Sequence, residues 1–519
     1  MNSENLQQNR TTRLARNTIY LYLQMLVQLL VSLFTTRVVI DTLGQSDYGI
    51  FGVVGGVMGV FAVLNSIEAA TMRFITFEQG RGSGVERLHA VFSTARSVHL
   101  TIAAVVFILA ETVGLYYVFN FLNVPHERLA ATVTVYQFSI VTSLIGIMCA
   151  PYDALIVAHE RMGVFASIGI YNVLVNLIIV FLVKYASTDK LILYAALVML
   201  VQVSLRIIYG MYCRINFAET RGKWVFDRKL FVSMLKFGGW TFNGTLATVG
   251  FTQGINLLFN YFYGPLLNAA FAVAFAVENK VSSFADNFLA AARPQIVKSY
   301  AAGDSSYLHM LVINSSRIAA MLLFLLSLPI LLETSFILYV WLGEDIPPYT
   351  VWFVRLALMM AVVQSLGQVM CITIHATGRI AKFQMIEANI LLLIVPIAAW
   401  LLWKGYSPIV VLVAQLVVFV ITQVVRVLIV CPAVGLSILT YVREVLLRSM
   451  LVVAVGSILP LLLHVYGGMH EHPLTQVVCV SIVSLISSGL SIYFIGCTKS
   501  QRDIVLKKLK NLVQINNRQ

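Results

Sequence analysis

Long apolar stretches alternate with short polar segments along almost the whole chain. Each stretch is about 20 residues long, the length that an α-helix needs to cross the apolar layer of a bilayer. The polar segments contain the Gly, Pro, Asn and Asp residues that are typical of connections between helices. The pattern predicts an all-α polytopic membrane protein with about 14 transmembrane helices. The predicted spans are residues 17–36, 48–70, 97–118, 130–150, 163–183, 191–211, 237–261, 266–290, 313–332, 351–373, 384–403, 409–429, 450–466 and 476–496.

Composition and charge agree with this prediction. Hydrophobic residues make up 59% of the chain and charged residues 11%, against about 25% charged in ordinary soluble domains. The net charge of +13 reflects membrane topology rather than nucleic-acid binding, because basic residues gather on one side of the predicted bundle. We therefore expect both termini to be cytoplasmic. The predicted outer loops hold only Arg37, Arg128, Lys184, Lys190 and Lys404.

The chain shows a weak internal repeat. The shift that aligns Gly44 with Gly264 also aligns Arg73 with Arg293. It pairs the first six predicted spans with the next six, and repeats of even helix number keep the same orientation in the membrane. The predicted organisation is an N-terminal six-helix lobe (1–213), a cytoplasmic inter-lobe linker (214–236), a C-terminal six-helix lobe (237–431), two additional helices (432–498) and a basic amphipathic cytoplasmic tail (499–519).

Several ionisable residues fall inside predicted spans. A charge at the centre of a membrane helix costs about 2.5–3.5 kcal/mol on insertion scales, so it needs a partner, water or a function. Glu68 lies in the second span. In the eighth span Glu278, Ser282 and Asp286 are four residues apart and form one stripe of the helix. The stripe predicts the lining of a water-filled cavity; the alternative is that each group simply pairs with a neighbour.

Sequence motifs for hydrolysis, metal binding or phosphate loops are missing from the chain. There is no GxxxxGK[ST], HExxH or GxSxG pattern and no paired-cysteine motif among the six cysteines. We therefore expect no catalytic residues, no metal site and no cofactor. The short outer loops also argue against a membrane glycosyltransferase or polymerase and favour transport.

Two N-terminal segments resemble a known family. TRVVIDTLGQSDYGIFGVVGG (36–56) and ATMRFITFEQGRG (70–82) are similar to the start of the polysaccharide-biosynthesis flippases, the O-antigen-type exporters of lipid-linked oligosaccharides in the MATE-like MOP superfamily. The pattern of Arg37, Leu43, Gly44, Tyr48 and Gly49 is its most specific part. Similarity at the level of motifs fades after about residue 100.

The resemblance implies a fold and an activity. The fold would be two six-helix bundles arranged as a V, plus two C-terminal helices. The activity would be alternating-access transfer of an undecaprenyl-pyrophosphate-linked oligosaccharide across the bacterial inner membrane, for surface polysaccharide, O-antigen and lipopolysaccharide assembly. Coupling would use Na⁺ or H⁺. The expected partners are this lipid-linked substrate and membrane lipids, with the polysaccharide assembly machinery as a further candidate. The sequence leaves the oligomeric state open, and a monomer is the expectation.

A diphosphate headgroup would be bound by cationic donors in a hydrated cavity. The candidate residues are Arg37, Lys280, Arg293 and Arg73. Arg73 and Arg293 have an alternative role as ordinary cytoplasmic anchors. Candidates for ion coupling or for polar cavity lining are Glu68, Glu278, Asp286 and Asn287. The main alternative function is a MATE-type cation-coupled multidrug exporter, and a membrane-embedded polysaccharide polymerase is a weaker one.

Overall fold

A computed structural model describes residues 3–61, 67–120, 125–344, 346–467, 473–498 and 501–502; for parts of α1 (Ser3–Phe61), and for Ile67 and Pro265, it describes the backbone alone. Within these ranges the chain is helical with short connections and contains no strand. The all-α prediction is therefore confirmed. The predicted amphipathic tail from residue 503 onward and the side chain of Arg37 lie outside the described residues.

Ten helical segments among the described residues are long and apolar enough to cross a membrane. α8 (Arg228–Tyr263) and α9 (Pro265–Ala301) have 36 and 37 residues, but they are too polar to count among the ten. α1 is interrupted at Gly44, where φ is 80° and ψ is 162°, so it comprises two consecutive helices. The chain is thus a multi-pass membrane protein, and the total of fourteen spans stays a prediction. The ten segments are Val85–Asn120, His126–Ala158, Met162–Lys184, Lys190–Asn216, Ser305–Leu332, Thr350–Thr377, Ala381–Trp403, Pro408–Ala433, Ile438–Tyr466 and Pro473–Gly496.

The chain divides into two compact units that do not follow sequence order. The first contains Met1–Leu246, Ala290–Asp304 and Gly378–Met385, and the second contains the remaining residues. α8 and α9 therefore each contribute one end to the first unit and the other end to the second. The predicted lobe boundaries at residues 213, 236 and 431 stay a prediction.

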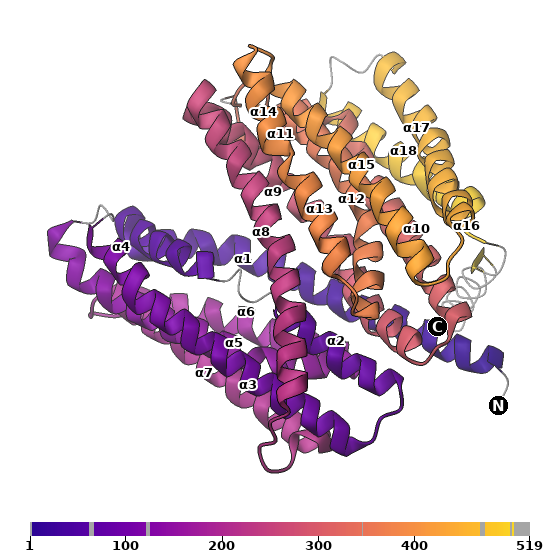
Figure 1. The fold of residues 1–519 in the computed structure, drawn as a ribbon. Coiled ribbons are helices and arrows are strands. Elements are labelled where there is room, and N and C mark those ends of the chain that lie inside the picture. The colour runs from indigo at the N-terminus through magenta and orange to yellow at the C-terminus, as the bar shows by residue number, and fades with distance from the viewer. Residues whose placement is uncertain are drawn as a thin grey trace, which may run out of the picture. The chain divides into compact units, whose positions relative to one another are not determined.

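The first unit is built around α5, which packs against α7, α3, α2 and α1 (Figure 1). Its core is formed by apolar side chains such as Phe92, Leu155 and Met234, all buried. Burial of these side chains holds the helices together. The helices of this unit, besides α1, the start of α8, the end of α9 and the start of α13 (Ala381–Leu392), are α2 (Ile67–Gly80), α3 (Val85–Leu109), α4 (Leu115–Asn120), α5 (Leu129–Ala158), α6 (Met162–Lys184) and α7 (Lys190–Asn216).

The basic segment between α7 and α8 packs along α3. The two ring nitrogens of His89 lie 2.7 Å from the Glu219 carbonyl oxygen and 2.9 Å from that of Lys223. The Trp224 indole N–H donates to Ser97 Oγ at 2.9 Å. Side chains of α3 thus satisfy backbone groups of a segment that has little regular structure of its own.

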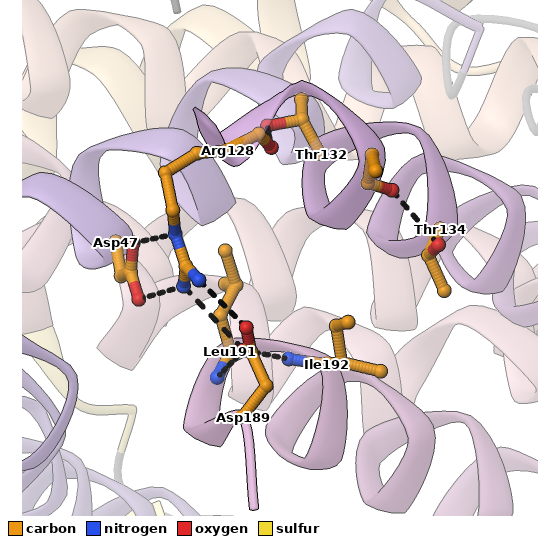
Figure 2. Close-up of polar contacts among 8 residues, drawn as sticks. Asp47, Arg128, Thr132, Thr134, Asp189, Leu191 and Ile192 are labelled. Carbon is orange, nitrogen blue, oxygen red and sulfur yellow. Dashed lines mark hydrogen bonds and ion pairs between the residues drawn. The ribbon is translucent and has the colours of Figure 1, made fainter. Parts of the chain in front are cut away.

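Arg128 connects three helices of the first unit (Figure 2). Its Nε donates to Asp47 Oδ1 at 3.0 Å, and its Nη1 donates to Asp189 Oδ2 at 2.6 Å. Asp189 also caps α7, because its Oδ1 accepts from the backbone N–H groups of Leu191 and Ile192. One guanidinium therefore joins the second helix of α1, the start of α5 and the start of α7 through charge-assisted hydrogen bonds.

In the second unit, α12 packs between α10 and α15, and the α17–α18 pair packs on α10 (Figure 1). Met321 and Phe324 of α10 form a small apolar core with Val452 of α17. The helices here, besides parts of α8, α9 and α13 (Ala381–Leu392), are α10 (Ser305–Leu332), α11 (Thr334–Leu342), α12 (Thr350–Thr377), α14 (Ile394–Trp403), α15 (Pro408–Ala433), α16 (Ile438–Tyr441), α17 (Arg448–Tyr466) and α18 (Pro473–Ser491).

Candidate functional site

The polar run predicted in the eighth span lies on α9, and its side chains are not enclosed by dry packing. Val281, Ala285 and Phe288 are buried on the apolar face of the helix. Lys280 and Asp286 are exposed. A charged face of a membrane helix avoids contact with lipid tails, because the ionised groups would lose their hydration. The exposed groups of α9 therefore mark a surface that water reaches.

Two of the predicted acidic residues, Glu278 and Asp286, interact with each other on this face of α9. Glu278 Oε1 accepts from the Ser282 hydroxyl at 2.8 Å, and the Glu278 and Asp286 carboxyl groups interact electrostatically. Asp286 Oδ1 also accepts from Gln368 Nε2 of α12 at 2.7 Å. Gln364 lies one turn from Gln368 and is exposed as well. α12 thus extends the polar face. Gln364 and Gln368 were not predicted as site residues, although two glutamines four residues apart inside an apolar span were a usable signal.

The other two predicted residues of this helix differ in environment. Asn287 is half-buried, and its Nδ2 donates to the Ser283 carbonyl oxygen at 2.8 Å. Lys280 makes no ion pair with any residue that the structure describes. An exposed ammonium group can donate to an anionic headgroup, whereas the carboxylates of Glu278 and Asp286 on the same face oppose an anion.

Glu68 lies in a second polar cluster, within the first unit. Its carboxyl group interacts electrostatically with Arg293 and with Asp153 of α5. Asp153 also interacts electrostatically with Tyr209 of α7. Its Oδ1 has no hydrogen-bond partner among the described residues. Two carboxyl groups and one guanidinium form a site whose net charge depends on proton or cation occupancy.

Asp153 was not predicted as a site residue. The fourth span was expected to end at residue 150, but α5 continues without interruption through Pro151 to Ala158. Asp153 therefore belongs to the transmembrane helix rather than to a loop. The uninterrupted apolar run on both sides of Asp153 was the signal that could have identified it.

Arg73 is enclosed by aromatic rings. Its guanidinium carbon lies 4.6 Å from the ring centre of Phe77, 4.9 Å from that of Phe74 and 5.7 Å from that of Phe237. The side chain also fills the space beside Gly378, where a Cβ atom would lie 2.5 Å from Nη2. Burial lowers the pKa of Arg73 to about 10. Arg73 and Arg293, which align in the repeat, therefore have different surroundings.

The end of α9 is held in the first unit by an ion-pair cluster. Lys298 Nζ lies 2.9 Å from Glu160 Oε1, and Arg13 Nε lies 3.4 Å from Glu160 Oε2. Asn17 donates to the Glu160 carbonyl oxygen at 3.2 Å. Burial lowers the pKa of Lys298. Glu160, with a left-handed φ of 55°, thus joins α1 to the last turns of α9.

A charged pair is buried inside the second unit. Arg426 of α15 donates from Nε to Glu387 Oε1 of α13 at 2.9 Å, and Nη2 donates to the same oxygen. The Cys371 thiol lies 3.8 Å from that oxygen. A side chain at Gly367 would collide with the guanidinium, since a Cβ atom there would overlap Arg426 Nη1. Pairing offsets the desolvation cost of burying these two charged side chains.

The fold is similar to that of solved MATE-like membrane transporters. An outward-facing multidrug-resistance MATE transporter of the MOP superfamily is similar in fold, with a TM-score of 0.72 at 13% identity over 82% of this chain and 96% of that one. The bent form of the Vibrio cholerae MATE transporter VcmN aligns with a TM-score of 0.68 at 13% identity, covering 84% of this chain and 100% of that one.

A third similar structure is a Pyrococcus furiosus MOP-superfamily transporter described as having a binding pocket of reversed polarity. Its TM-score is 0.63 at 13% identity, with 81% of this chain and 95% of that one covered. The comparison with curated proteins gave no match. Residues 14–299 match the profile of the family described as polysaccharide biosynthesis protein. Because this match spans more than half of the chain, the protein belongs to that family, as the N-terminal motifs predicted.

Proposed function

We propose that the protein is a flippase for an undecaprenyl-pyrophosphate-linked oligosaccharide, used in the assembly of a surface polysaccharide such as O-antigen. The proposal assigns it to the bacterial inner membrane, with both termini in the cytoplasm, and gives it no catalytic site. Membership of the polysaccharide biosynthesis family and the MATE-like fold support this class of activity. The observation that carries the proposal is the exposed polar face of α9, with the side chains of Lys280 and Asp286 exposed.

The chemistry of the substrate suits this face. A diphosphate and a glycan need hydrogen bonds and positive charge, whereas the lipid tail is stable in the bilayer. We assign the diphosphate to Lys280, Arg37 and Arg293, with Arg73 as a further donor that must first leave its aromatic cage. Asp286, Glu278 and Asn287 then provide hydrogen-bonding groups for water or for sugar hydroxyls.

We assign energy coupling to the Glu68–Asp153 cluster. Two carboxyl groups that repel each other favour the binding of a proton or Na⁺, and Arg293 competes with that cation. Because Arg293 is also a candidate diphosphate donor, arrival of the substrate and release of the cation would be linked through this one side chain. No cofactor is required for such a cycle. Polysaccharide assembly enzymes that supply or consume the lipid-linked glycan would be its functional partners.

Charge reversal at Lys280 tests the proposal. Lys280→Glu should abolish surface display of the glycan in a strain that lacks the native gene, because a carboxylate repels the diphosphate. Lys404→Glu, a reversal at an exposed lysine just after α14, is the matched control and should leave display intact. Both proteins are checked for membrane insertion by immunoblot of membrane fractions. Normal glycan display by the inserted Lys280→Glu protein would refute this assignment.

Cation-coupled drug export is the second candidate function. The similarity to MATE transporters and the acidic Glu68–Asp153 cluster favour it. The two functions differ in the phenotype of a deletion strain. Loss of surface glycan with unchanged drug sensitivity supports the flippase, whereas increased drug sensitivity with a normal glycan supports the exporter.

A further inference from the structure

Three arginines gather where α10, the π-helical turn before α17 (η5, Val442–Leu447) and the end of α18 meet. Arg317 of α10 is 1% exposed. It interacts electrostatically with Arg448, the first residue of α17, and with Cys497. Cys497 in turn interacts electrostatically with Arg502. Arg317 and Arg502 thus both act on the Cys497 thiol, and Arg448 lies next to Arg317.

The hydrogen bonds in this cluster leave donors unused. Arg317 Nη2 donates to Asn314 Oδ1 at 3.0 Å and to Gln501 Oε1 at 2.9 Å. Arg317 Nη1 and Arg502 Nε are buried and have no partner among the described residues. A buried guanidinium N–H without an acceptor costs free energy, so these donors favour an acceptor beyond those that the described residues supply.

The charged side chains of the cluster also favour the binding of an anion. Glu444 is the one carboxylate that interacts with Arg317 in the described chain, and it also pairs with Arg448 at 3.1 Å. Among the described residues, the cluster therefore has three arginines and one carboxylate. A phosphate group carries the missing negative charge and several acceptor oxygens, and arginine binds it in bidentate geometry.

An apolar pocket lies next to this cluster, between α10, α12 and α17. Its volume is about 300 Å³. Met321 lines it one helical turn from Arg317, and Ser449 lines it directly after Arg448. The side chain of Met450, also in the lining, is 66% exposed on the surface of α17. The pocket therefore reaches the outer surface of the bundle, where lipid chains have access.

We propose that this cluster and pocket form a binding site for an anionic phospholipid of the bilayer. The headgroup phosphate accepts from Arg317, Arg448 and Arg502, and one acyl chain enters the apolar pocket. A bilayer phospholipid fits better than a soluble phosphate because the pocket-lining residues Met321 and Ser449 lie one helical turn from Arg317 and directly after Arg448. The site is separate from the polar face of α9, so it does not depend on the proposed transport substrate.

Native mass spectrometry of the purified protein, titrated with phosphatidylglycerol, tests the headgroup site. Arg448→Gln combined with Arg502→Gln should weaken lipid binding at least about tenfold, the effect of losing one charge-assisted hydrogen bond. Arg443→Gln changes an exposed arginine of the same π-helical turn and should leave binding unchanged. Circular dichroism confirms that the variants are folded. Equal binding by the double variant and the Arg443→Gln control would overturn the proposal.

A second pair of variants tests the acyl-chain pocket. Ala454→Phe fills the pocket lining and should weaken phosphatidylglycerol binding, whereas Leu451→Phe, at an exposed position of α17 outside the lining, should not. Inorganic phosphate that displaces the lipid at equal concentration would overturn the proposal in favour of a soluble-anion site. Binding of a polyprenyl phosphate in place of phosphatidylglycerol would overturn the assignment to a bilayer phospholipid.

Discussion

Gly44 and Gly264 have the same backbone φ of 80°, although they lie in different halves of the sequence. Gly44 interrupts α1, and Gly264 separates α8 from α9. The two glycines also align in the weak sequence repeat. A shared left-handed turn at equivalent positions supports an origin of the two halves from one helical unit, because glycine adopts this conformation without the strain that a Cβ introduces.

Gly264→Ala should lower the free energy of unfolding by about 1–2 kcal/mol, the cost of a left-handed conformation for a residue with a side chain. A Cβ at Gly264 would have no heavy atom within 4 Å, so backbone strain alone produces the loss. The measurement is unfolding of the purified protein in mixed detergent micelles.

Gly239→Ala is the control for this prediction. Gly239 lies within α8 and also has open space around its Cβ position, but its φ is not left-handed. Alanine there should stabilise the helix by about 0.5–1 kcal/mol. Equal effects of the two substitutions would contradict the role of the turn.

Asp153→Asn should remove the dependence of transport on the cation gradient. The substitution preserves the shape of the side chain but eliminates the charge that repels Glu68, so the cluster no longer needs a proton or Na⁺. Substrate transfer is measured in proteoliposomes with and without imposed proton and sodium gradients. Glu111→Gln, which changes a carboxylate that accepts from Gln137 at 3.3 Å, should keep the gradient response. The assignment fails if Asp153→Asn responds to the gradients as the wild type does.

Lys298→Met should release the last turns of α9 from the first unit. The substitution removes a cation that lies 2.9 Å from the largely buried Glu160 carboxylate, and breaking a buried pair from one side costs about 3–5 kcal/mol. Hydrogen exchange of residues 290–304 reports the release as faster exchange.

Two further variants test whether the Lys298–Glu160 ion pair itself holds this segment. Glu160→Gln combined with Lys298→Met removes both charges and should recover part of the lost protection. Lys229→Met changes an exposed lysine near the start of α8 and serves as the control. Unchanged exchange in the Lys298→Met protein would show that packing alone holds this segment.

Asp227 should make stability depend on pH in the acidic range. The backbone N–H of Leu230 and the Arg87 guanidinium, at 3.0 and 3.3 Å, hold the pKa of Asp227 below its ordinary value of 3.8. A lowered carboxyl pKa adds stability above the ordinary value, and this is lost as the pH falls through the lower folded-state value.

Thermal unfolding in detergent as a function of pH measures this contribution. Asp227→Asn keeps a side chain that can cap α8 but should flatten the part of the acid profile that Asp227 contributes. Glu86→Gln, at an exposed position in the first turn of α3, should leave the profile as it is. A wild-type acid profile in the Asp227→Asn protein would contradict the prediction.

The sequence by itself determined the class of the protein. Helix length and hydrophobicity are local properties, and the bilayer requires them of every span, so the apolar stretches predicted an all-α membrane protein. The same holds for the polar face of α9, because a stripe of residues four apart is set by the helical period. The N-terminal motifs likewise predicted the family that the profile match confirms.

Only the tertiary structure decided which polar groups meet. Three contacts were not predicted from the sequence. Gln368 donates to Asp286, Asp153 lies near Glu68, and aromatic rings enclose Arg73. Such pairings depend on the rotation of each helix about its axis and on packing between segments far apart in the chain. The hydrophobic period of a single helix contains no information on helix rotation or on packing between distant segments. The residues that share a site are therefore known only from the packed structure.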